Sequence, residues 1–196
     1  MILKHNYYFF KKAIPVSTCK KILKAGRKRI AKKATTLGDV PLARDSTTAW
    51  LSEPWIYNDI INPFVHMANK QAGWNFQWDW NEDSQFTIYE KDEYYKWHTD
   101  QSYTPIKSKG KNVDGKYRKL SLTLQLTDQT EYEGGDFQFA WIIHGRKDLV
   151  HITTADDLKE IGTIIIFPSF IWHQVLPITK GKRESLVNWS LGKAFN

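Results

Sequence analysis

The sequence has almost no cysteine and no long apolar run, and each shortage excludes a class of protein. Cys19 is the single cysteine among 196 residues, so a secreted domain held together by internal disulfides is excluded. No stretch of about 18 apolar residues exists, which excludes a helix that spans a membrane. The first residues lack the apolar core and cleavage site of a signal peptide. We therefore expect a cytoplasmic protein that has no membrane partner.

Acidic residues are absent from the first 35 positions, which carry eleven of the 28 lysines and arginines. The rest of the chain holds all 21 acidic residues, so the net charge of +7 comes from the N-terminal segment. A run of this kind is usually the solvated face of a helix, although it can also attract nucleic acid or an acidic partner. The sequence leaves the role of this basic segment open.

Apolar residues recur at helical spacing in two segments of the first 74 residues. The expected elements, in order, are a strand over 6–10, a helix over 17–35, a strand over 47–51 and a helix over 54–73. Ser17 is the expected N-cap of the first helix. Asn62 and Pro63 should kink or restart the second helix, and Gly73 should end it.

From Asn75 the apolar spacing changes to that of short strands separated by turn residues. The expected strands cover 75–79, 85–90, 119–127, 136–142, 149–152, 163–167, 173–176 and 184–192. Helices followed by strands favour helices packed on one face of an antiparallel sandwich or barrel. The predicted fold class is therefore α+β and mainly β. We expect a single domain over residues 1–196, with 1–74 as a helical support and 75–196 as the core.

The segment Trp97-His98-Thr99-Asp100 offers two metal-ligating side chains at strand spacing. Residues i and i+2 of an extended segment point to the same face, about 6–7 Å apart, so His98 and Asp100 should project together. That separation suits one metal ion. An isolated His-x-Asp pair also occurs by chance at protein surfaces, so the pair needs support from the rest of the chain.

That support comes from a second cluster, after the apolar strand that ends at Phe167. A turn and a returning strand predict a hairpin that brings Arg183 back toward His173. Two histidines and a carboxylate form the facial triad that leaves open positions on Fe(II), and an arginine fork can hold a carboxylate. The set His98, Asp100, His173 and Arg183 therefore suits an α-keto acid that binds iron at one end and arginine at the other.

Six short motifs follow one another over residues 86–192. They are FTIY (86–89), YKWHTD (95–100), RKLSLTLQL (118–126), EGGDF (133–137), FPS with the following histidine (167–173), and V-x-P leading to G-x-R and a tryptophan (175–189). No single motif is specific, but in this order they resemble the Fe(II)- and 2-oxoglutarate-dependent dioxygenases. Within that family the chain is most similar to the prolyl 4-hydroxylase-like branch.

The resemblance implies a double-stranded β-helix, or jelly roll, with the N-terminal helices packed outside it. It implies that His98, Asp100 and His173 are the catalytic iron ligands. It further implies that Fe(II), 2-oxoglutarate and O2 take part in the reaction, which hydroxylates a C–H bond and releases succinate and CO2.

The resemblance also implies which residues hold 2-oxoglutarate. Arg183 would bind its distal carboxylate, and Tyr89 and Gln125 occupy positions of further contacts in relatives. The leading substrate is a prolyl residue in a peptide or protein. A free amino acid or another small molecule remains an alternative.

Three other readings stay open. Nucleic-acid demethylases of this superfamily carry a second arginine six residues after the first, and Trp189 stands there instead, so nucleic acid is not favoured. The ligand set also suits a zinc hydrolase, although a hydrolase needs no arginine aimed at a dicarboxylate. The last reading is a β-sandwich binding protein without catalysis. The oligomeric state does not follow from the sequence.

Overall fold

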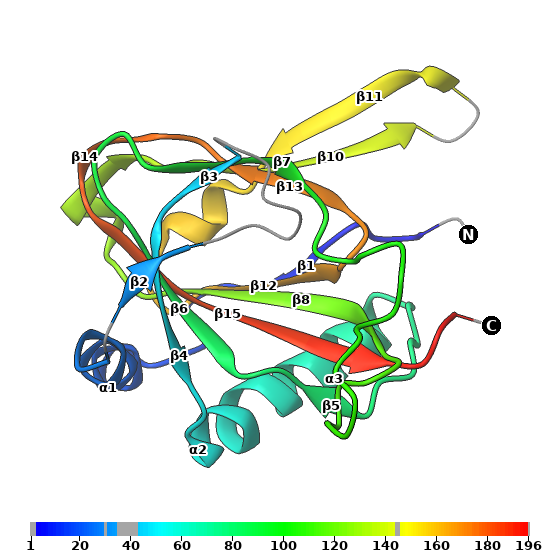
Figure 1. The fold of residues 1–196 in the computed structure, drawn as a ribbon. Coiled ribbons are helices and arrows are strands. Elements are labelled where there is room, and N and C mark those ends of the chain that lie inside the picture. Colours follow the sequence, from blue (N-terminus) through cyan, green and yellow to red (C-terminus); the bar gives the residue numbers. More distant parts are fainter. Residues whose placement is uncertain (1–2, 30, 35–42, 144–145, 196) are drawn as a thin grey trace.

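A computed structural model describes residues 3–29, 31–34, 43–143 and 146–195 (Figure 1). Two antiparallel sheets face each other, and the helices cover the outer side of the larger sheet (Figure 1). This arrangement confirms the predicted fold class, which is mainly β with N-terminal helices on one face. Within the described residues, no helix is both long and apolar enough to cross a membrane.

The larger sheet has eight strands in the order β1-β12-β8-β15-β6-β4-β2, with β5 beside β15. Their bounds, in that order, are β1 (Tyr8–Phe10), β12 (Ile164–Pro168), β8 (Tyr117–Gln125), β15 (Arg183–Gly192), β6 (Ser84–Tyr89), β4 (Thr47–Leu51), β2 (Lys32–Lys33) and β5 (Trp80–Asn81). The first 74 residues therefore contribute edge strands to this sheet as well as helices. Their separation into a support and a core stays a prediction.

The smaller sheet has five strands in the order β11-β10-β13-β7-β3. They are β11 (Arg146–Thr154), β10 (Phe137–Ile143), β13 (Trp172–Val175), β7 (Tyr94–His98) and β3 (Arg44–Asp45). A separate ribbon joins β14 (Ile178–Gly181) to β9 (Tyr132–Gly134), and two 3-10 turns cover Gln129–Glu131 and Asp156–Lys159.

The two faces of the larger sheet differ in polarity because successive strand residues point to opposite sides. The outer face presents buried apolar residues to the helices, including Phe86, Leu120, Leu122, Leu124, Ile164, Ile166 and Leu186. The inner face presents buried polar residues to the smaller sheet, including Thr87, Ser121, Thr123, Gln125, Arg183 and Ser185. An apolar cluster that includes Phe139, Phe167 and Val175 also packs between the sheets.

The first helix, α1 (Val16–Arg27), is shorter than predicted. Pro15, rather than Ser17, occupies its N-cap position, and no side chain caps it. The chain leaves the helix because residues 32–33 pair with Thr47 and Thr48 as β2, and edge pairing replaces the predicted last turns. Residue 35, where the predicted helix ended, lies outside the described residues.

The second predicted helix is interrupted before Pro63, as expected. It comprises α2 (Pro54–Ile56), a π-helical turn η1 (Tyr57–Ile61) and α3 (Asn62–Gln71). Pro63 has no N–H to bond the carbonyl of Asp59, and its ring crowds that carbonyl, so the preceding turn widens. The helix stops just before Gly73, whose φ of 72° confirms the predicted end.

The predicted strand over 75–79 is wrong, since the regular pairing begins only at Trp80. The side-chain amide of Asn69 donates to the Phe76 carbonyl and accepts from the Phe76 N–H, each at 2.9 Å. A buried side chain thus satisfies the backbone groups that a neighbouring strand would otherwise bind. Asn75 also has a positive φ of 53°, which is incompatible with a regular strand.

Candidate active site

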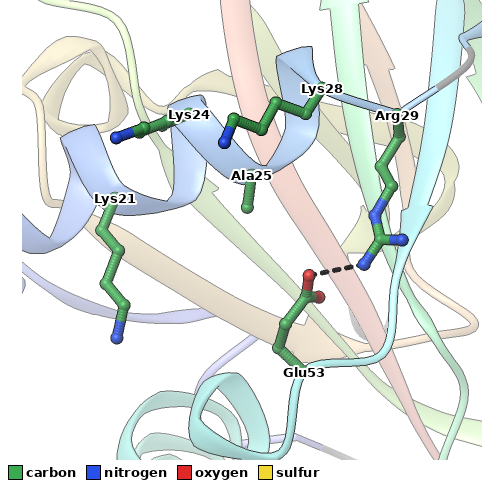
Figure 2. A pocket seen from close by; sticks show the side chains of 6 residues that line it. All are labelled: Lys21, Lys24, Ala25, Lys28, Arg29 and Glu53. Carbon is green, nitrogen blue, oxygen red and sulfur yellow. Dashed lines mark hydrogen bonds and ion pairs between the residues drawn. The ribbon is translucent and has the colours of Figure 1, made fainter.

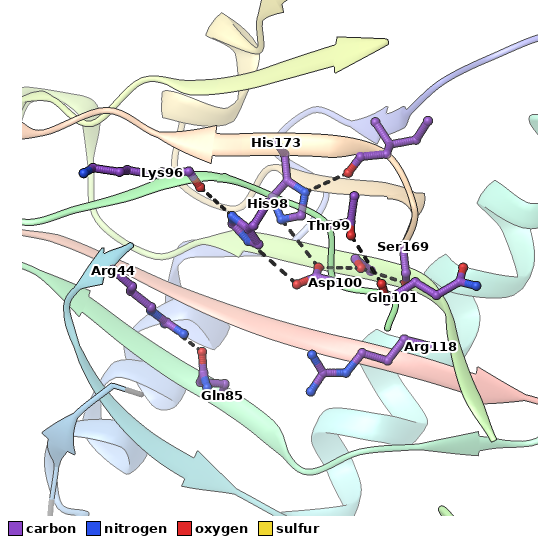
Figure 3. A network of polar contacts seen from close by, with 12 residues as sticks. Arg44, Gln85, Lys96, His98, Thr99, Asp100, Gln101, Arg118, Ser169 and His173 are labelled. Atoms are coloured by element: carbon purple, nitrogen blue, oxygen red, sulfur yellow. Dashed lines mark hydrogen bonds and ion pairs between the residues drawn. The ribbon is translucent and has the colours of Figure 1, made fainter. Parts of the chain in front are cut away.

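Three metal-ligating side chains meet between the two sheets. His98 ends β7 and lies directly opposite His173 of β13 in the strand register, and Asp100 follows two residues after His98. Nε2 of His98 lies 3.9 Å from Oδ1 of Asp100, and Nε2 of His173 lies 3.5 Å from Oδ2. One ligand atom from each residue lies within 4.8 Å of the other two. The three side chains point toward one another (Figure 3), so they could hold one metal ion.

The backbone fixes the orientation of both imidazoles. Nδ1 of His98 lies 2.7 Å from the Lys96 carbonyl, and Nδ1 of His173 lies 3.0 Å from the Ile171 carbonyl. Because a carbonyl only accepts, each Nδ1 carries the proton and donates it. Each Nε2 therefore keeps its lone pair for a metal ion, in the arrangement expected for ligating histidines.

Hydrogen bonds also hold the Asp100 carboxylate in place. Ser121 of β8 donates to Oδ2 of Asp100 at 2.7 Å, and its Oγ lies 2.9 Å from Oγ of Ser169. The backbone N–H groups of Asp100 and Gln101 both donate to the Ser169 carbonyl at 2.9 Å. Asp100 follows a strand of the smaller sheet, but its position is fixed by Ser121 of the larger sheet and by Ser169 in the Pro-Ser corner before β13.

The protonation states suit metal binding. Burial, and secondarily the nearby His173, lowers the pKa of His98 to about 3, so this imidazole is neutral near pH 7. Burial alone would raise the pKa of Asp100. The charges of His173, His98 and Arg118 and the Ser121 hydrogen bond outweigh that effect and lower the pKa of Asp100 to about 2. A neutral imidazole and an ionised carboxylate are the forms that bind a metal.

The larger sheet supplies a buried cation to the same interior. Arg183 opens β15, pairs with Tyr89 of β6 in the register, and is only 2% exposed. Its Nη2 is buried and has no hydrogen-bond partner among the described residues. An uncompensated buried charge is costly, so this guanidinium fits an anionic ligand such as a carboxylate. The guanidinium carbon lies 5.9 Å from the centroid of the Tyr89 ring.

The predicted hairpin between His173 and Arg183 is wrong. The strand of His173 belongs to the smaller sheet and that of Arg183 to the larger one, with β14 between them in the chain. The sandwich, rather than a hairpin, brings both residues to its interior. Gly135 of the EGGDF motif allows this packing, because a Cβ there would lie 2.4 Å from Ile178 and 3.3 Å from Cδ of Arg183.

Gln125 lies near this cation on the inner face of β8, opposite Ser185 in the register. Its Nε2 donates to the Thr127 carbonyl at 3.0 Å and to the Tyr132 hydroxyl at 3.2 Å. Its buried Oε1 has no partner in the described part of the chain. Gln125 is therefore held in place by one end of its amide, while the other end remains available to a ligand.

Arg118 is a site residue that the sequence reading missed. Its guanidinium stacks over the Trp189 ring at 3.8 Å and donates twice to Glu82 at 2.7 Å. Strand alternation would place Arg118 on the outer face with Leu120. The register against β15 shifts at Ser190 and Leu191, however, and this irregularity turns Arg118 inward. No pattern in the sequence marks that shift.

Arg44 and Tyr95 form a second group of side chains that the sequence reading did not assign to the metal centre. The Arg44 guanidinium lies 4.7 Å from the Tyr95 ring centroid, and the Tyr95 and His98 rings stack at 3.4 Å. Arg44 also donates to Gln85 (Figure 3) and to Ser46. Burial raises the pKa of Tyr95 to about 12, so its phenol stays protonated and packs as a neutral ring.

Comparisons with known proteins agree with this geometry. A PKHD-type hydroxylase of Synechococcus sp. (strain CC9902) is 35% identical over 95 residues, which cover 48% of this chain. The matched segment spans only 35% of the length of that relative.

Solved structures share the fold. A prolyl-4-hydroxylase of Pseudomonas putida superposes with a TM-score of 0.69 at 17% identity, over 97% of this chain and 94% of the other. A prolyl hydroxylase of Trichoplax adhaerens, in complex with a hypoxia inducible factor peptide fragment, gives 0.68 at 14% identity over 94% and 83%. Residues 84–191 match the sequence profile of the 2OG-Fe(II) oxygenase superfamily, and this match includes all three metal-ligating side chains and Arg183. The chain belongs to the 2OG-Fe(II) oxygenase superfamily.

Proposed function

We propose that the protein is an Fe(II)- and 2-oxoglutarate-dependent dioxygenase that hydroxylates a prolyl residue of a peptide or protein. The observation that carries this proposal is the pairing of a His-Asp-His cluster with the buried guanidinium of Arg183, whose Nη2 has no hydrogen-bond partner among the described residues. A hydrolytic zinc site would need the first feature but not the second. Superfamily membership supplies the cofactor set of Fe(II), 2-oxoglutarate and O2.

Each side chain has a distinct role in this proposal. His98, Asp100 and His173 would hold iron, and Ser121 would keep the carboxylate in its ligating orientation. Arg183 would pair with the distal carboxylate of 2-oxoglutarate, beside Tyr89 and Gln125. Bound iron and 2-oxoglutarate supply the oxidative chemistry. The chain orients them and surrounds them with buried side chains that exclude water.

The preference for a prolyl residue rests on the relatives. The comparisons name PKHD-type hydroxylases in sequence and prolyl hydroxylases in structure, one of them with a bound peptide. Arg118 stacks over the Trp189 ring, and its charge acts on Asp100, so this pair lies close enough to the metal ligands to contact a substrate. A free amino acid is the alternative substrate, and a screen of both classes would separate them.

The experiment needs no substrate. The metal-free protein is titrated anaerobically with Fe(II) and then with 2-oxoglutarate, while visible absorption and tryptophan fluorescence are followed. Both should bind saturably, and 2-oxoglutarate should require iron. In Arg183→Ala, 2-oxoglutarate binding should weaken about a hundredfold, because a buried charge pair loses one partner, while iron binding persists.

Lys182→Ala is the matched control, since Lys182 precedes Arg183 but remains partly exposed. Its affinity for 2-oxoglutarate should stay within about twofold of the parent, as expected for a surface charge. Iron binding without any 2-oxoglutarate binding would contradict the proposal and favour a hydrolytic metal site.

A further inference from the structure

A long groove lies on the outer side of the larger sheet, between α1 and the segment that runs from Glu53 into α3. Its first half has a volume of about 370 Å³ and is lined by Lys21, Lys24, Ala25, Lys28, Arg29 and Glu53 (Figure 2). Its second half has a volume of about 280 Å³ and is lined mainly by apolar residues, among them Ile14, Pro15, Trp55, Ile60 and Phe64. Lys21 lines both halves, and its ammonium lies 3.7 Å from the centroid of the Trp55 ring, so this side chain stands where the two halves meet.

The lysines of this groove differ from the other cations of the basic N-terminal segment. Many of those others bind acidic side chains elsewhere in the fold: Lys12 binds Glu160, Arg27 binds Glu184, and Lys33 binds Asp45 and Glu93. Lys24 and Lys28 have no acidic partner among the residues that the structure describes, and Lys21 only covers the Trp55 ring at 3.7 Å. The positive charges of Lys24 and Lys28 are therefore not neutralised by an acidic side chain among the described residues.

The spacing of these lysines forms a row. Lys21, Lys24 and Lys28 stand at i, i+3 and i+7 of α1, so they share one face of the helix. They span about 10 Å along its axis at 1.5 Å per residue. Figure 2 shows their side chains along the rim of the groove, with the Arg29–Glu53 ion pair of 2.7 Å at its far end.

We propose that this groove is a docking site for an acidic peptide segment of a protein partner. Acidic side chains of the segment would face the row of lysines. A bulky apolar side chain would enter the second half, beside Trp55 and Phe64. This inference does not depend on the reaction at the metal centre, because the groove lies on the opposite face of the larger sheet.

Two features favour a peptide over nucleic acid. The second half offers a phosphate backbone only Lys21 among its charged residues as a cation, whereas its apolar surface can bury an apolar side chain. Glu53 and Asp59 also line the groove, and their carboxylates can accept hydrogen bonds from donors on a ligand, which a phosphate group does not supply. A peptide supplies N–H groups that can approach such carboxylates.

The test measures the binding of labelled probes by fluorescence anisotropy at low salt. The probes are a fluorescein-labelled peptide of repeated Glu-Glu-Leu-Phe, an all-glutamate peptide of equal length and a single-stranded DNA of mixed sequence. The Glu-Glu-Leu-Phe peptide should bind saturably, and more tightly than the other two. Lys24→Glu/Lys28→Glu should weaken its binding about tenfold, because two attractions become repulsions.

The control variant Lys91→Glu/Lys193→Glu makes the same charge change at two exposed lysines outside the groove. It should leave the affinity within about twofold. Equal losses in the two variants would mean that net charge alone attracts the peptide, and would overturn the proposal. Tighter binding of DNA that depends on Lys24 and Lys28 would overturn it in favour of a nucleic-acid surface, and no saturable peptide binding would overturn it outright.

Discussion

In β8, Leu120, Leu122 and Leu124 point to the helices, whereas Ser121, Thr123 and Gln125 point to the smaller sheet. All six are buried, so burial alone does not explain the choice of residue. The outer side chains pack against helices and gain stability from apolar contact. The polar inner side chains do not contribute this apolar stabilisation. They face the interior that holds the metal-ligating cluster and Arg183. The comparison separates residues that hold the fold from residues that serve the site.

The largest effect is expected from Asp100→Ala. Removing the carboxylate between the two imidazoles should abolish Fe(II) binding and 2-oxoglutarate turnover, while the free energy of unfolding changes by only about 1 kcal/mol. Iron titration, a succinate assay and chemical denaturation measure the three quantities. Thr99→Ala is the control one residue away, where all three should persist. Turnover in Asp100→Ala would end the assignment of this residue to the metal site.

Leu122→Ala should produce the opposite result on the outer face. Leu122 is 1% exposed in the outer cluster, and truncating such a residue costs about 2–5 kcal/mol of unfolding free energy. The folded fraction should still bind 2-oxoglutarate with the parental affinity. Thr123→Ala, the next residue on the inner face, should cost less stability. If Leu122→Ala and Thr123→Ala lost equal stability, the proposed division between a stabilising outer face and a functional inner face would be wrong.

Ser121→Ala tests the contact between the sheet and the metal cluster. Ser121 is fully buried and donates to Asp100, so its loss should weaken iron binding about 10- to 100-fold, as is typical when a hydrogen bond that orients a metal ligand is removed. Stability should change by about 1 kcal/mol. Ser185→Ala provides a control on the same inner face. Unchanged iron affinity in Ser121→Ala would show that Asp100 is oriented by the backbone of the Pro-Ser corner alone.

The His98–Asp100 part of the metal cluster could be predicted from the sequence because its geometry is local: the i, i+2 spacing needs only an extended backbone. The place of His173 beside them was implied by the family resemblance, and in the structure it results from the long-range pairing of β13 with β7. The position of Arg183 was predicted for the wrong reason. A hairpin was inferred from the turn, whereas the two residues lie on different sheets and both reach the interior of the sandwich because the sheets pack together.

Features that depend on long-range contacts could not be predicted. The inward turn of Arg118 results from a register irregularity against β15, and the coil over 75–79 results from hydrogen bonds of Asn69 to Phe76. The early end of α1 has the same kind of cause, since β2 pairs with a strand distant in the sequence. In each case the local sequence favours one structure and a tertiary partner stabilises another.

The smallest effect is expected at Cys19, in the helical layer that covers the outer face. Burial raises the pKa of its thiol from 9.0 to about 11, so the thiol of the unfolded chain ionises first as pH rises. The native state then binds more protons than the unfolded state, and the free energy of unfolding should fall between pH 9 and pH 11, by about 1 kcal/mol at pH 10. Denaturation at several pH values should give a shallower decline in Cys19→Ala than in the parent. If the unfolding free energy declined equally with pH in the parent and in Cys19→Ala, the thiol of Cys19 would be exposed to water in the native state. The helices would then shield the outer face of the larger sheet from water less completely than the smaller sheet shields the inner face.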